Sequence, residues 1–336
     1  MRTLLGAFAL VAAASAQALD VAPPPYQARK EAAGVVRVWG NPEMKVVLER
    51  WEEGFRRANP EVSFENHLTG SDVGMAGLYT GNADIALLGR DAAASEVKAF
   101  EWIYRYRPER VEIMVGGLDR PGRSPALVAY VHRDNPLASL TLMQLDAIFS
   151  HERLRGAPAA IQTWGDLGLG GDWADKPINL YTFDTETGTG RYFRDAALKD
   201  SRKLHWERMK EFKDTSDLGK PSHDAGRRIL EALVADRYGL AVASGPAPAQ
   251  VKALALAPAE GEGIAPTPEN LVSRRYPFVR GIFAYYNRKP DTPLDAPVAR
   301  FLRYVLSAEG QHDVGERDEY MPLTAQAAEA ERRKLD

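Results

Sequence analysis

The sequence predicts an α/β protein with mostly parallel sheets, divided into about two domains. Short apolar runs typical of strands alternate with longer segments whose apolar residues recur every three or four positions, as in helices that cover a sheet. The chain has 336 residues and is 45% hydrophobic, which is enough for two domains with substantial cores. No repeat of fixed period and no long low-complexity tract interrupts this alternation.

The first eighteen residues form a separate segment. Arg2 precedes the apolar run LLGAFALVAAA, and an A-x-A cleavage pattern ends at Ala18. The run is too short to span a bilayer, so we predict a cleaved signal peptide at residues 1–18 and a periplasmic location. A short buried N-terminal helix is the alternative. The proline-rich stretch that follows, residues 19–33, is expected to be an extended leader arm.

The composition excludes several classes of function. The chain has no cysteine, which rules out disulfides, thiolate nucleophiles and cysteine metal sites. Its net charge is -3, and no basic face is apparent, so nucleic acid is not an expected partner.

The first elements form a βαβ unit. The strand-like run Gly34–Gly40 is followed by Met44, Val47, Leu48, Trp51 and Phe55, which make one apolar stripe at helical spacing. A second strand is expected over Val62–His67, and a buried strand over Ala83–Gly89. Because a crossover helix joins them, these strands should be parallel.

The remaining elements continue the alternation. Thr141 and Gln144 form a capping box for a helix with the sequence LMQLDAIF. A strand over Ile178–Phe183 precedes a helix that is expected to begin near Arg191. The further strands are expected over Ser124–Pro136, Tyr238–Ser244 and Phe278–Asn287, with one helix around Ile229–Val234 and a final helix around Val298–Leu306.

Three loops between a strand and a helix share an unusual composition: Trp39–Met44, Leu68–Gly74 and Thr185–Gly190. They are rich in glycine and hydroxyl residues, and they stand where a helix begins. Close backbone N–H groups, hydroxyl donors and the positive end of the helix dipole can together replace the hydration of an anion. The alternative is simple helix capping by Ser71 and by Thr187 or Thr189.

The order of the loops carries a resemblance to a known family. The stretches WGNPEMKVVLERWEEGF, TGSDVGMAGLYTGNADIALLGR, DNPLASLTLMQLDAIFS, TETGTGRYF and PTPENLVSRRYPFVRGIFAYYN occur in this order behind the signal peptide, and FLRYVLSAEGQHDVGERDEYMPL follows them. Together they resemble the periplasmic phosphate-binding proteins of the phosphate ABC transporter (Pst-type), from about Val35 to Leu323.

The resemblance implies a two-lobed type II periplasmic-binding-protein fold with a hinge of two crossing strands and an interlobe cleft. Lobe one would comprise residues 34–127 plus 247–330, and lobe two residues 128–246. The implied function is capture of inorganic phosphate or a similar oxyanion for an ABC importer. The implied partner is the membrane permease, the expected state is a monomer, and no cofactor, metal or catalytic residue is expected.

The resemblance also implies site residues. Ser71 matches the family's G-S loop serine, and Thr187-Gly188-Thr189 matches its Ser-Gly-Thr signature. The family's ligand-contacting aspartate falls at Gly89, and its phosphate-pairing arginine falls at Phe183. We expect Arg90 or Arg191 to replace that charge and Glu43 to accept a proton from phosphate, with Glu186 as a second flanking carboxylate. The candidate ligand-binding set is Asn41, Glu43, Ser71, Arg90, Thr187, Gly188, Thr189 and Arg191.

Two other functions are considered. A serine-dependent exported hydrolase would need a partner histidine for Ser71, but none of the six histidines lies in an H-E-x-x-H motif and no serine lies in a G-x-S-x-G motif. A binding module with the same fold but another ligand, or with a decayed pocket, would also be consistent with Gly89 and Phe183.

Overall fold

The computed structural model describes residue 25 and residues 34–336, except 119–123, 218–219, 260 and 316–319. The predicted signal peptide and nearly all of the predicted leader arm lie outside the described residues. Within the described ranges, no helix is both long enough and apolar enough to cross a bilayer.

The first of two large sheets contains strands from both the N-terminal and the C-terminal part of the described chain. Its strand order is β15-β4-β14-β3-β1-β2, with β1, β2 and β3 parallel and the others antiparallel to their neighbours. The parallel part is the predicted βαβ unit. The strands are β1 (Gly34–Gly40), β2 (Val62–Leu68), β3 (Ile85–Leu88), β4 (Glu109–Gly116), β14 (Gly281–Tyr286) and β15 (Tyr320–Met321).

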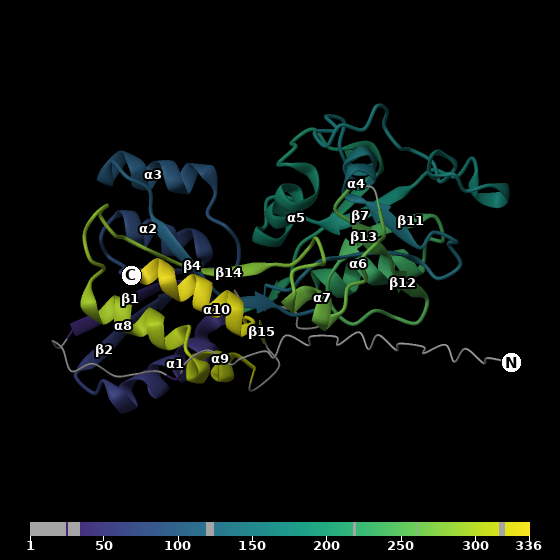
Figure 1. Cartoon of the computed structure of the whole chain (residues 1–336). Coiled ribbons are helices and arrows are strands. Elements are labelled where there is room, and N and C mark those ends of the chain that lie inside the picture. The colour runs from purple at the N-terminus through teal and green to yellow at the C-terminus, as the bar shows by residue number, and fades with distance from the viewer. Residues whose placement is uncertain (1–24, 26–33, 119–123, 218–219, 260, 316–319) are drawn as a thin grey trace, which may run out of the picture.

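Helices cover both faces of this sheet (Figure 1). Side chains of β3 alternate between the faces, as strand geometry requires: Ile85 and Leu87 pack with one core, and Ala86 and Leu88 with the other. The predicted helical stripe is buried in the core that contains Ile85 and Leu87. Each of its residues Val47, Leu48, Trp51 and Phe55 is at most 2% exposed. The helices are α1 (Lys45–Ala58), α2 (Ser71–Tyr79), α3 (Ala94–Tyr104), α8 (Ala296–Val305), α9 (Ala308–Gly315) and α10 (Ala325–Arg332).

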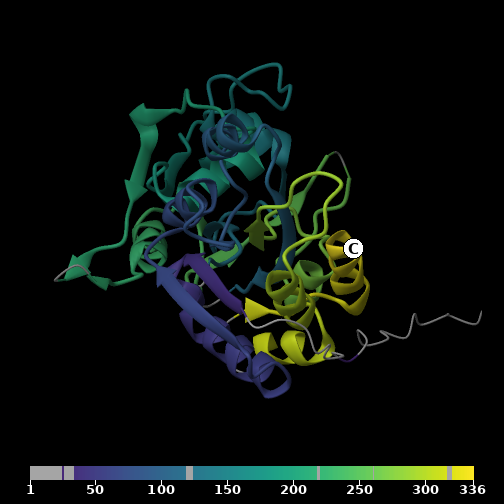
Figure 2. The same ribbon diagram turned by 90° about the vertical axis from the view of Figure 1, so that its left-hand side faces the viewer.

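The second large sheet has the order β12-β5-β11-β7-β8. Figure 2 shows its teal elements above the purple and blue strands of the first sheet. Its strands are β5 (Val128–His132), β7 (Asn179–Phe183), β8 (Met209–Phe212), β11 (Gly239–Ala243) and β12 (Val251–Ala253). The small pairs are β6 (Ser139–Thr141) with β13 (Ala255–Ala257) and β9 (Ser216–Asp217) with β10 (Lys220–Pro221). The helices are α4 (Leu142–Phe149), α5 (Gly188–Leu198), α6 (Ala225–Val234) and α7 (Pro268–Val272).

Local sequence signals explain several of these boundaries. The predicted capping box at α4 is present: Gln144 N donates to Thr141 Oγ1 at 3.0 Å, and Thr141 N donates to Gln144 Oε1 at 2.8 Å. Other predictions were wrong in detail. α5 begins at Gly188 rather than near Arg191, because Thr187 is its N-cap. The helices α3, α9 and α10 and the strand β4 were not predicted from the sequence. The strand β5 is shorter than the expected strand Ser124–Pro136.

The chain passes between the two sheets twice. It leaves the first sheet after β4 and enters the second at β5, and it returns at β14. Val279, just before β14, packs against both large cores. The expected lobe one includes residues 247–330, but β12 pairs with β5 and Leu271 of α7 lies in the core of the second sheet. These parts of residues 247–330 therefore pack with the second sheet.

Candidate functional site

A cavity of about 600 Å³ lies where loops of the two sheets meet. Its walls come from loops that follow β1, β2, β3, β7 and β11. The carboxyl ends of parallel strands are where open α/β sheets bind ligands. All eight residues of the predicted ligand-binding set line this cavity: Asn41, Glu43, Ser71, Arg90, Thr187, Gly188, Thr189 and Arg191.

The loop after β1 presents a carboxylate held by a serine. Glu43 Oε2 accepts hydrogen bonds from Ser124 N at 3.0 Å and from Ser124 Oγ at 3.2 Å. Asn41 caps the short 3-10 helix Pro42–Met44 through its Oδ1, which accepts from Glu43 N at 2.9 Å. Asn41 Nδ2 lies 3.3 Å from Ser124 Oγ. Ser124 therefore supplies the hydroxyl group beside Glu43. This role of Ser124 was not predicted from the sequence.

The loop after β2 leads directly into α2. Gly70 is the N-cap residue, and Ser71 is the first residue of the helix. The alternative that Ser71 caps α2 is therefore wrong. Ser71 Oγ makes no hydrogen bond to the described residues, and the first backbone N–H groups of any helix lack partners within it. The start of α2 can thus donate several hydrogen bonds into the cavity.

The two threonines at the start of α5 differ in role. Thr187 Oγ1 accepts from Gly190 N at 3.1 Å and donates to Asp184 O at 2.6 Å, so its hydroxyl is used within the cap. Thr189 Oγ1 instead accepts a hydrogen bond from Arg280 Nη1 at 3.1 Å. Glu186, the second flanking carboxylate, is largely exposed and pairs with Arg194 at 3.3 Å. Among these side chains, only Thr189 contacts the opposite wall of the cavity.

Arg280 is the most important residue that the sequence analysis missed. It is 4% exposed and lines the cavity, where its Nε donates to Gly89 O at 2.5 Å and its guanidinium lies 5.4 Å from the Tyr192 ring centroid. Burial lowers the pKa of Arg280, and the charge of Glu43 opposes this shift. No carboxylate of the described residues lies within 4.0 Å of its guanidinium nitrogens. The wall thus contains a buried cation whose hydrogen-bond partners are neutral.

Arg90 is already paired with carboxylates. Its Nη1 lies 2.8 Å from Glu96 Oε2, and its Nη2 contacts Asp72. Burial alone would lower the pKa of Arg90, but Glu96 and Asp72 outweigh burial and raise it. Arg191 Nη1 lies 3.8 Å from the same Asp72. Much of the positive charge expected from Arg90 and Arg191 is therefore balanced by these acids.

Gly89 and Phe183 stand where the resemblance places the family's aspartate and arginine. The packing around each position gives a steric reason for the residue found there. Phe183 is buried in the core of the second sheet. A Cβ at Gly89 would lie 2.0 Å from Ser124 Oγ, so a side chain at position 89 has no room while Ser124 is present. Ser124 has a positive φ of 46°, which places its hydroxyl in that space at some backbone cost.

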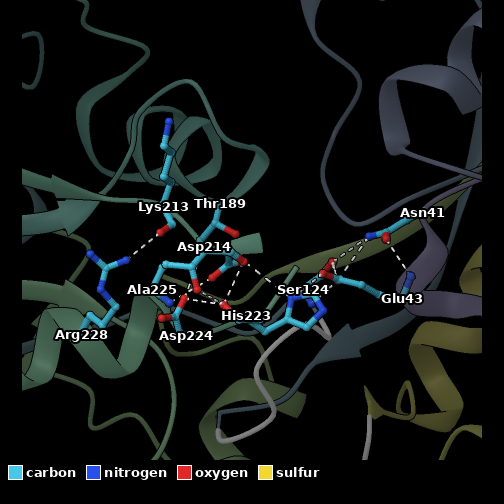
Figure 3. Close-up of polar contacts among 12 residues, drawn as sticks. Asn41, Glu43, Ser124, Thr189, Lys213, Asp214, His223, Asp224, Ala225 and Arg228 are labelled. Atoms are coloured by element: carbon cyan, nitrogen blue, oxygen red, sulfur yellow. Dashed lines mark hydrogen bonds and ion pairs between the residues drawn. The ribbon is translucent and has the colours of Figure 1, made fainter. Parts of the chain in front are cut away.

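A histidine on the second sheet's side of the cavity faces Glu43 on the first sheet's side (Figure 3). His223 Nδ1 lies 3.5 Å from Asp214 Oδ2 and 4.0 Å from Glu43 Oε1. Asp224, the next residue, has a pKa lowered to about 2 by hydrogen bonds from the Ser222 hydroxyl and Thr215 N. These side chains make the cavity rich in both acids and bases. No role for His223 was predicted from the sequence.

The fold and the cavity together define a two-lobed binding protein of the periplasmic-binding class. A sequence profile described as a PBP superfamily domain matches residues 27–309. The phosphate-binding protein PstS of Pseudomonas aeruginosa is 33% identical over 321 residues, covering 95% of this chain and 92% of that protein. The chain belongs to the PBP superfamily and, within it, to the family of PstS phosphate-binding proteins.

Solved structures agree on the fold. PstS from Borrelia burgdorferi has a TM-score of 0.58 at 17% identity, covering 86% of this chain and 98% of its own. An ABC-type phosphate transport receptor from Vibrio cholerae has a TM-score of 0.57 at 17% identity, covering 85% and 99%. A putative phosphate ABC transporter substrate-binding protein from Clostridium perfringens, solved with bound phosphate, has a TM-score of 0.51 at 21% identity, covering 86% and 100%. The predicted two-lobed α/β fold is confirmed.

Proposed function

We propose that this protein captures inorganic phosphate, or a similar small tetrahedral oxyanion, between its two lobes as the substrate-binding component of an ABC importer. The names of the relatives support phosphate as the ligand. The observation in this chain that carries the proposal is Arg280. A buried guanidinium whose hydrogen-bond partners are all neutral is costly by itself, and an anion in the cavity would supply a directly paired negative charge.

The proposed anion would be held from both sheets. Ser71 and the first N–H groups of α2 approach from the first sheet. The N–H groups of Gly188 and Thr189, with the Thr189 hydroxyl, approach from the start of α5. Arg280 lies within hydrogen-bonding distance of Thr189 and supplies a planar pair of donors suited to an oxyanion. Thr187 would act through the geometry of the cap.

Glu43 would give the site its preference for a protonated anion. Its carboxylate can accept a hydrogen bond from the P–OH group of phosphate, whereas sulfate carries no proton at neutral pH and would be repelled. Ser124 and Asn41 both donate to Glu43 Oε2, and Asn41 also donates to the Ser124 hydroxyl. Arg90 and Arg191 would adjust the electrostatic potential of the cavity through Asp72, because both arginines pair with its carboxylate.

We further propose that the two sheets are the cores of two lobes joined by a hinge. The hinge would lie at Ala126–Leu127 and at Val279–Arg280, so lobe two would extend over residues 128–278. Closure of such a hinge on the ligand would let a permease distinguish the loaded from the empty protein. The monomer, the periplasmic location and the absence of catalysis belong to the same proposal. In its support, Ser71 has no hydrogen bond to a histidine of the described residues.

The test is a titration of the mature protein with phosphate, sulfate, molybdate and small carboxylates. Calorimetry and thermal unfolding are the two readouts, because a ligand that binds only the folded state raises its melting temperature. Phosphate should bind one-to-one and more tightly than sulfate. A melting temperature unchanged by every oxyanion would contradict the proposal and favour a decayed pocket. Turnover of a phosphoester that is lost in Ser71→Ala would favour the hydrolase instead.

A further inference from the structure

Two histidines that are far apart in the sequence meet on the second sheet's side of the molecule, away from the residues that line the cavity. His151 follows α4, and His205 precedes the 3-10 helix Trp206–Arg208. Their ring centroids are 3.8 Å apart. Glu207 completes the group: its Oε1 lies 2.9 Å from His205 Nδ1, and its Oε2 lies 3.8 Å from His151 Nε2. We propose that these three side chains bind a divalent transition-metal ion of the zinc class.

The spacing of the possible ligand atoms fits such an ion. One nitrogen or oxygen of each residue can be chosen so that all three lie within 4.8 Å of one another. A tetrahedral zinc ion with ligands at about 2.0–2.2 Å needs ligand atoms about 3.3 Å apart. Glu207 approaches the two histidines with different oxygens, Oε1 at 2.9 Å from His205 Nδ1 and Oε2 at 3.8 Å from His151 Nε2, and these two separations fall on either side of that value.

The backbone holds the two histidines in place without a metal. Ser150 and Leu204 form an antiparallel β-bridge, which joins the segment after α4 to the segment before Glu207. His151 N donates to Lys203 O at 2.8 Å, and His205 N donates to Phe149 O at 3.0 Å. The ligand positions are therefore fixed by main-chain pairing, and a metal would not have to order a loose loop.

A histidine binds a metal through the lone pair of a neutral ring, so the tautomer of His205 decides which of its nitrogens can face the ion. Without a metal, Glu207 Oε1 accepts the proton of His205 Nδ1 at 2.9 Å, while the buried Nε2 has no hydrogen-bond partner among the described residues. Binding of a metal through Nδ1 requires the other tautomer, with the ring proton on Nε2.

A positive charge, Arg208, lies beside the site and is held there by the backbone. Arg208 Nε lies 3.9 Å from Glu207 Oε1, but its Nη1 and Nη2 donate to four main-chain carbonyls, those of Gln162, Ile178, Ile148 and Ile161. The guanidinium is thus held by the backbone and leaves Glu207 able to rotate toward the histidines. Two imidazoles and one carboxylate select zinc-class ions over magnesium and calcium, which prefer oxygen ligands. His151 and Glu207 are exposed, which leaves room for water as the remaining ligand.

The experiment is a calorimetric titration of the untagged mature protein with Zn²⁺ alone, in a phosphate-free buffer, with Mg²⁺ as a second titrant. The expected result is one zinc ion per chain and no binding of magnesium. His151→Ala and Glu207→Gln should each weaken zinc binding at least about tenfold. Both residues are exposed, so these variants should fold, and the unchanged melting temperature of the metal-free variants checks this.

Two further histidine variants keep the test specific. His312→Ala removes an exposed histidine elsewhere and should leave zinc binding unchanged. His223→Ala removes the cavity histidine, which faces Asp214 and Glu43 and is the competing position for an ion. Zinc binding that survives in His151→Ala, or that is lost in His223→Ala, would overturn the proposal, as would the absence of one-to-one binding. Phosphate affinity is measured separately, so neither result depends on the proposed transport function.

Discussion

Arg280 Nη1 and Thr189 Oγ1 are 3.1 Å apart, and this hydrogen bond joins the two sheets across the cavity. Arg280 immediately precedes β14 of the first sheet, and Thr189 lies in the first turn of α5 above the second. Since Arg280 Nε also donates to Gly89 O, one guanidinium connects the loop after β3, the start of β14 and the start of α5. Ligand affinity should depend on it more than on any other single side chain described above.

Replacing Arg280 with alanine is expected to weaken phosphate binding between about tenfold and about a hundredfold, since a hydrogen bond to a charged group contributes about 1.5–3 kcal/mol. Calorimetry on the purified variant measures this. Arg275→Ala is the matched control, because Arg275 is an exposed arginine of the same segment. Affinity within about twofold of the wild type in Arg280→Ala would show that the guanidinium does not contact the ligand.

The same chemical change at the two threonines of α5 should have different effects. Thr187→Val removes the N-cap acceptor and should lower the free energy of unfolding by about 1 kcal/mol. Thr189→Val leaves the cap intact and should weaken phosphate binding roughly tenfold or more, because the lost hydroxyl pairs with a charged group, Arg280, and with the charged anion. Urea unfolding and calorimetry on both variants separate the effects. Equal loss of stability in the two variants would contradict the assignment of the cap to Thr187.

Gly89 and Ser124 should show strong coupling. Gly89→Ala places a Cβ against Ser124 Oγ and should destabilise the protein, whereas in the Ser124→Gly background the nearest remaining atom is Asn41 Nδ2 at 3.0 Å, so the cost should be smaller. Neighbouring positions of this kind couple by about 0.5–3 kcal/mol. A double-mutant cycle of unfolding free energies measures the coupling. Additive effects would mean that the serine does not exclude a side chain at position 89.

Glu43→Gln tests the proposed selectivity for phosphate over sulfate. The amide removes the negative charge that repels sulfate, so the ratio of phosphate affinity to sulfate affinity should fall by about tenfold or more. Paired titrations with the two anions at one pH and one ionic strength give this ratio. A preference for phosphate unchanged from the wild type would assign the selectivity to another group.

The stability of the metal-free protein should fall as the pH drops below about 6.5 because of His205. Burial lowers the pKa of His205; the Glu207 hydrogen bond opposes this, and the Arg208 and His151 charges reinforce it. The unfolded chain therefore takes up a proton at a higher pH than the folded protein does. The stabilisation from neutral His205 is present above the pKa that His205 has in the unfolded chain. It is lost as the pH falls toward the pKa that His205 has in the folded protein.

Urea unfolding of the wild type and His205→Gln between pH 5 and 8, in the presence of a chelator, tests this sign. The wild type should lose stability on acidification faster than the variant. A steeper loss in His205→Gln would show that the folded protein stabilises the protonated ring.

Local sequence patterns were sufficient for much of the fold and for part of the site. The stripe from Val47 to Phe55 and the capping box at Thr141 depend on neighbours within one or two turns, so they could be predicted without coordinates. The three loops could also be predicted, because glycine and hydroxyl residues at the start of a helix act through local hydrogen bonds. These hydrogen bonds do not depend on contacts with distant parts of the chain. Their placement around one cavity followed from the resemblance.

The residues that were missed depend on contacts between distant parts of the chain. Arg280 stands in the run FVRGIFAYY, where a single arginine within an apolar strand was the only signal, and nothing local indicated that it would meet Thr189. The space beside Gly89 is filled by Ser124, which no local pattern links to it. His151 and His205 meet only because a β-bridge pairs their backbones. Such pairs are set by tertiary packing, which overrides local preference.

The two passages of the chain between the sheets lie next to each other, because Gly116 N donates to Arg280 O at 2.9 Å. The second sheet and its helices are therefore an insertion whose entry and exit are neighbours. A recombinant fragment of residues 126–279 should be excisable with its own core intact, and the flanking parts could be rejoined by a short glycine linker. Circular permutation that opens the chain within this insertion should likewise preserve the first sheet.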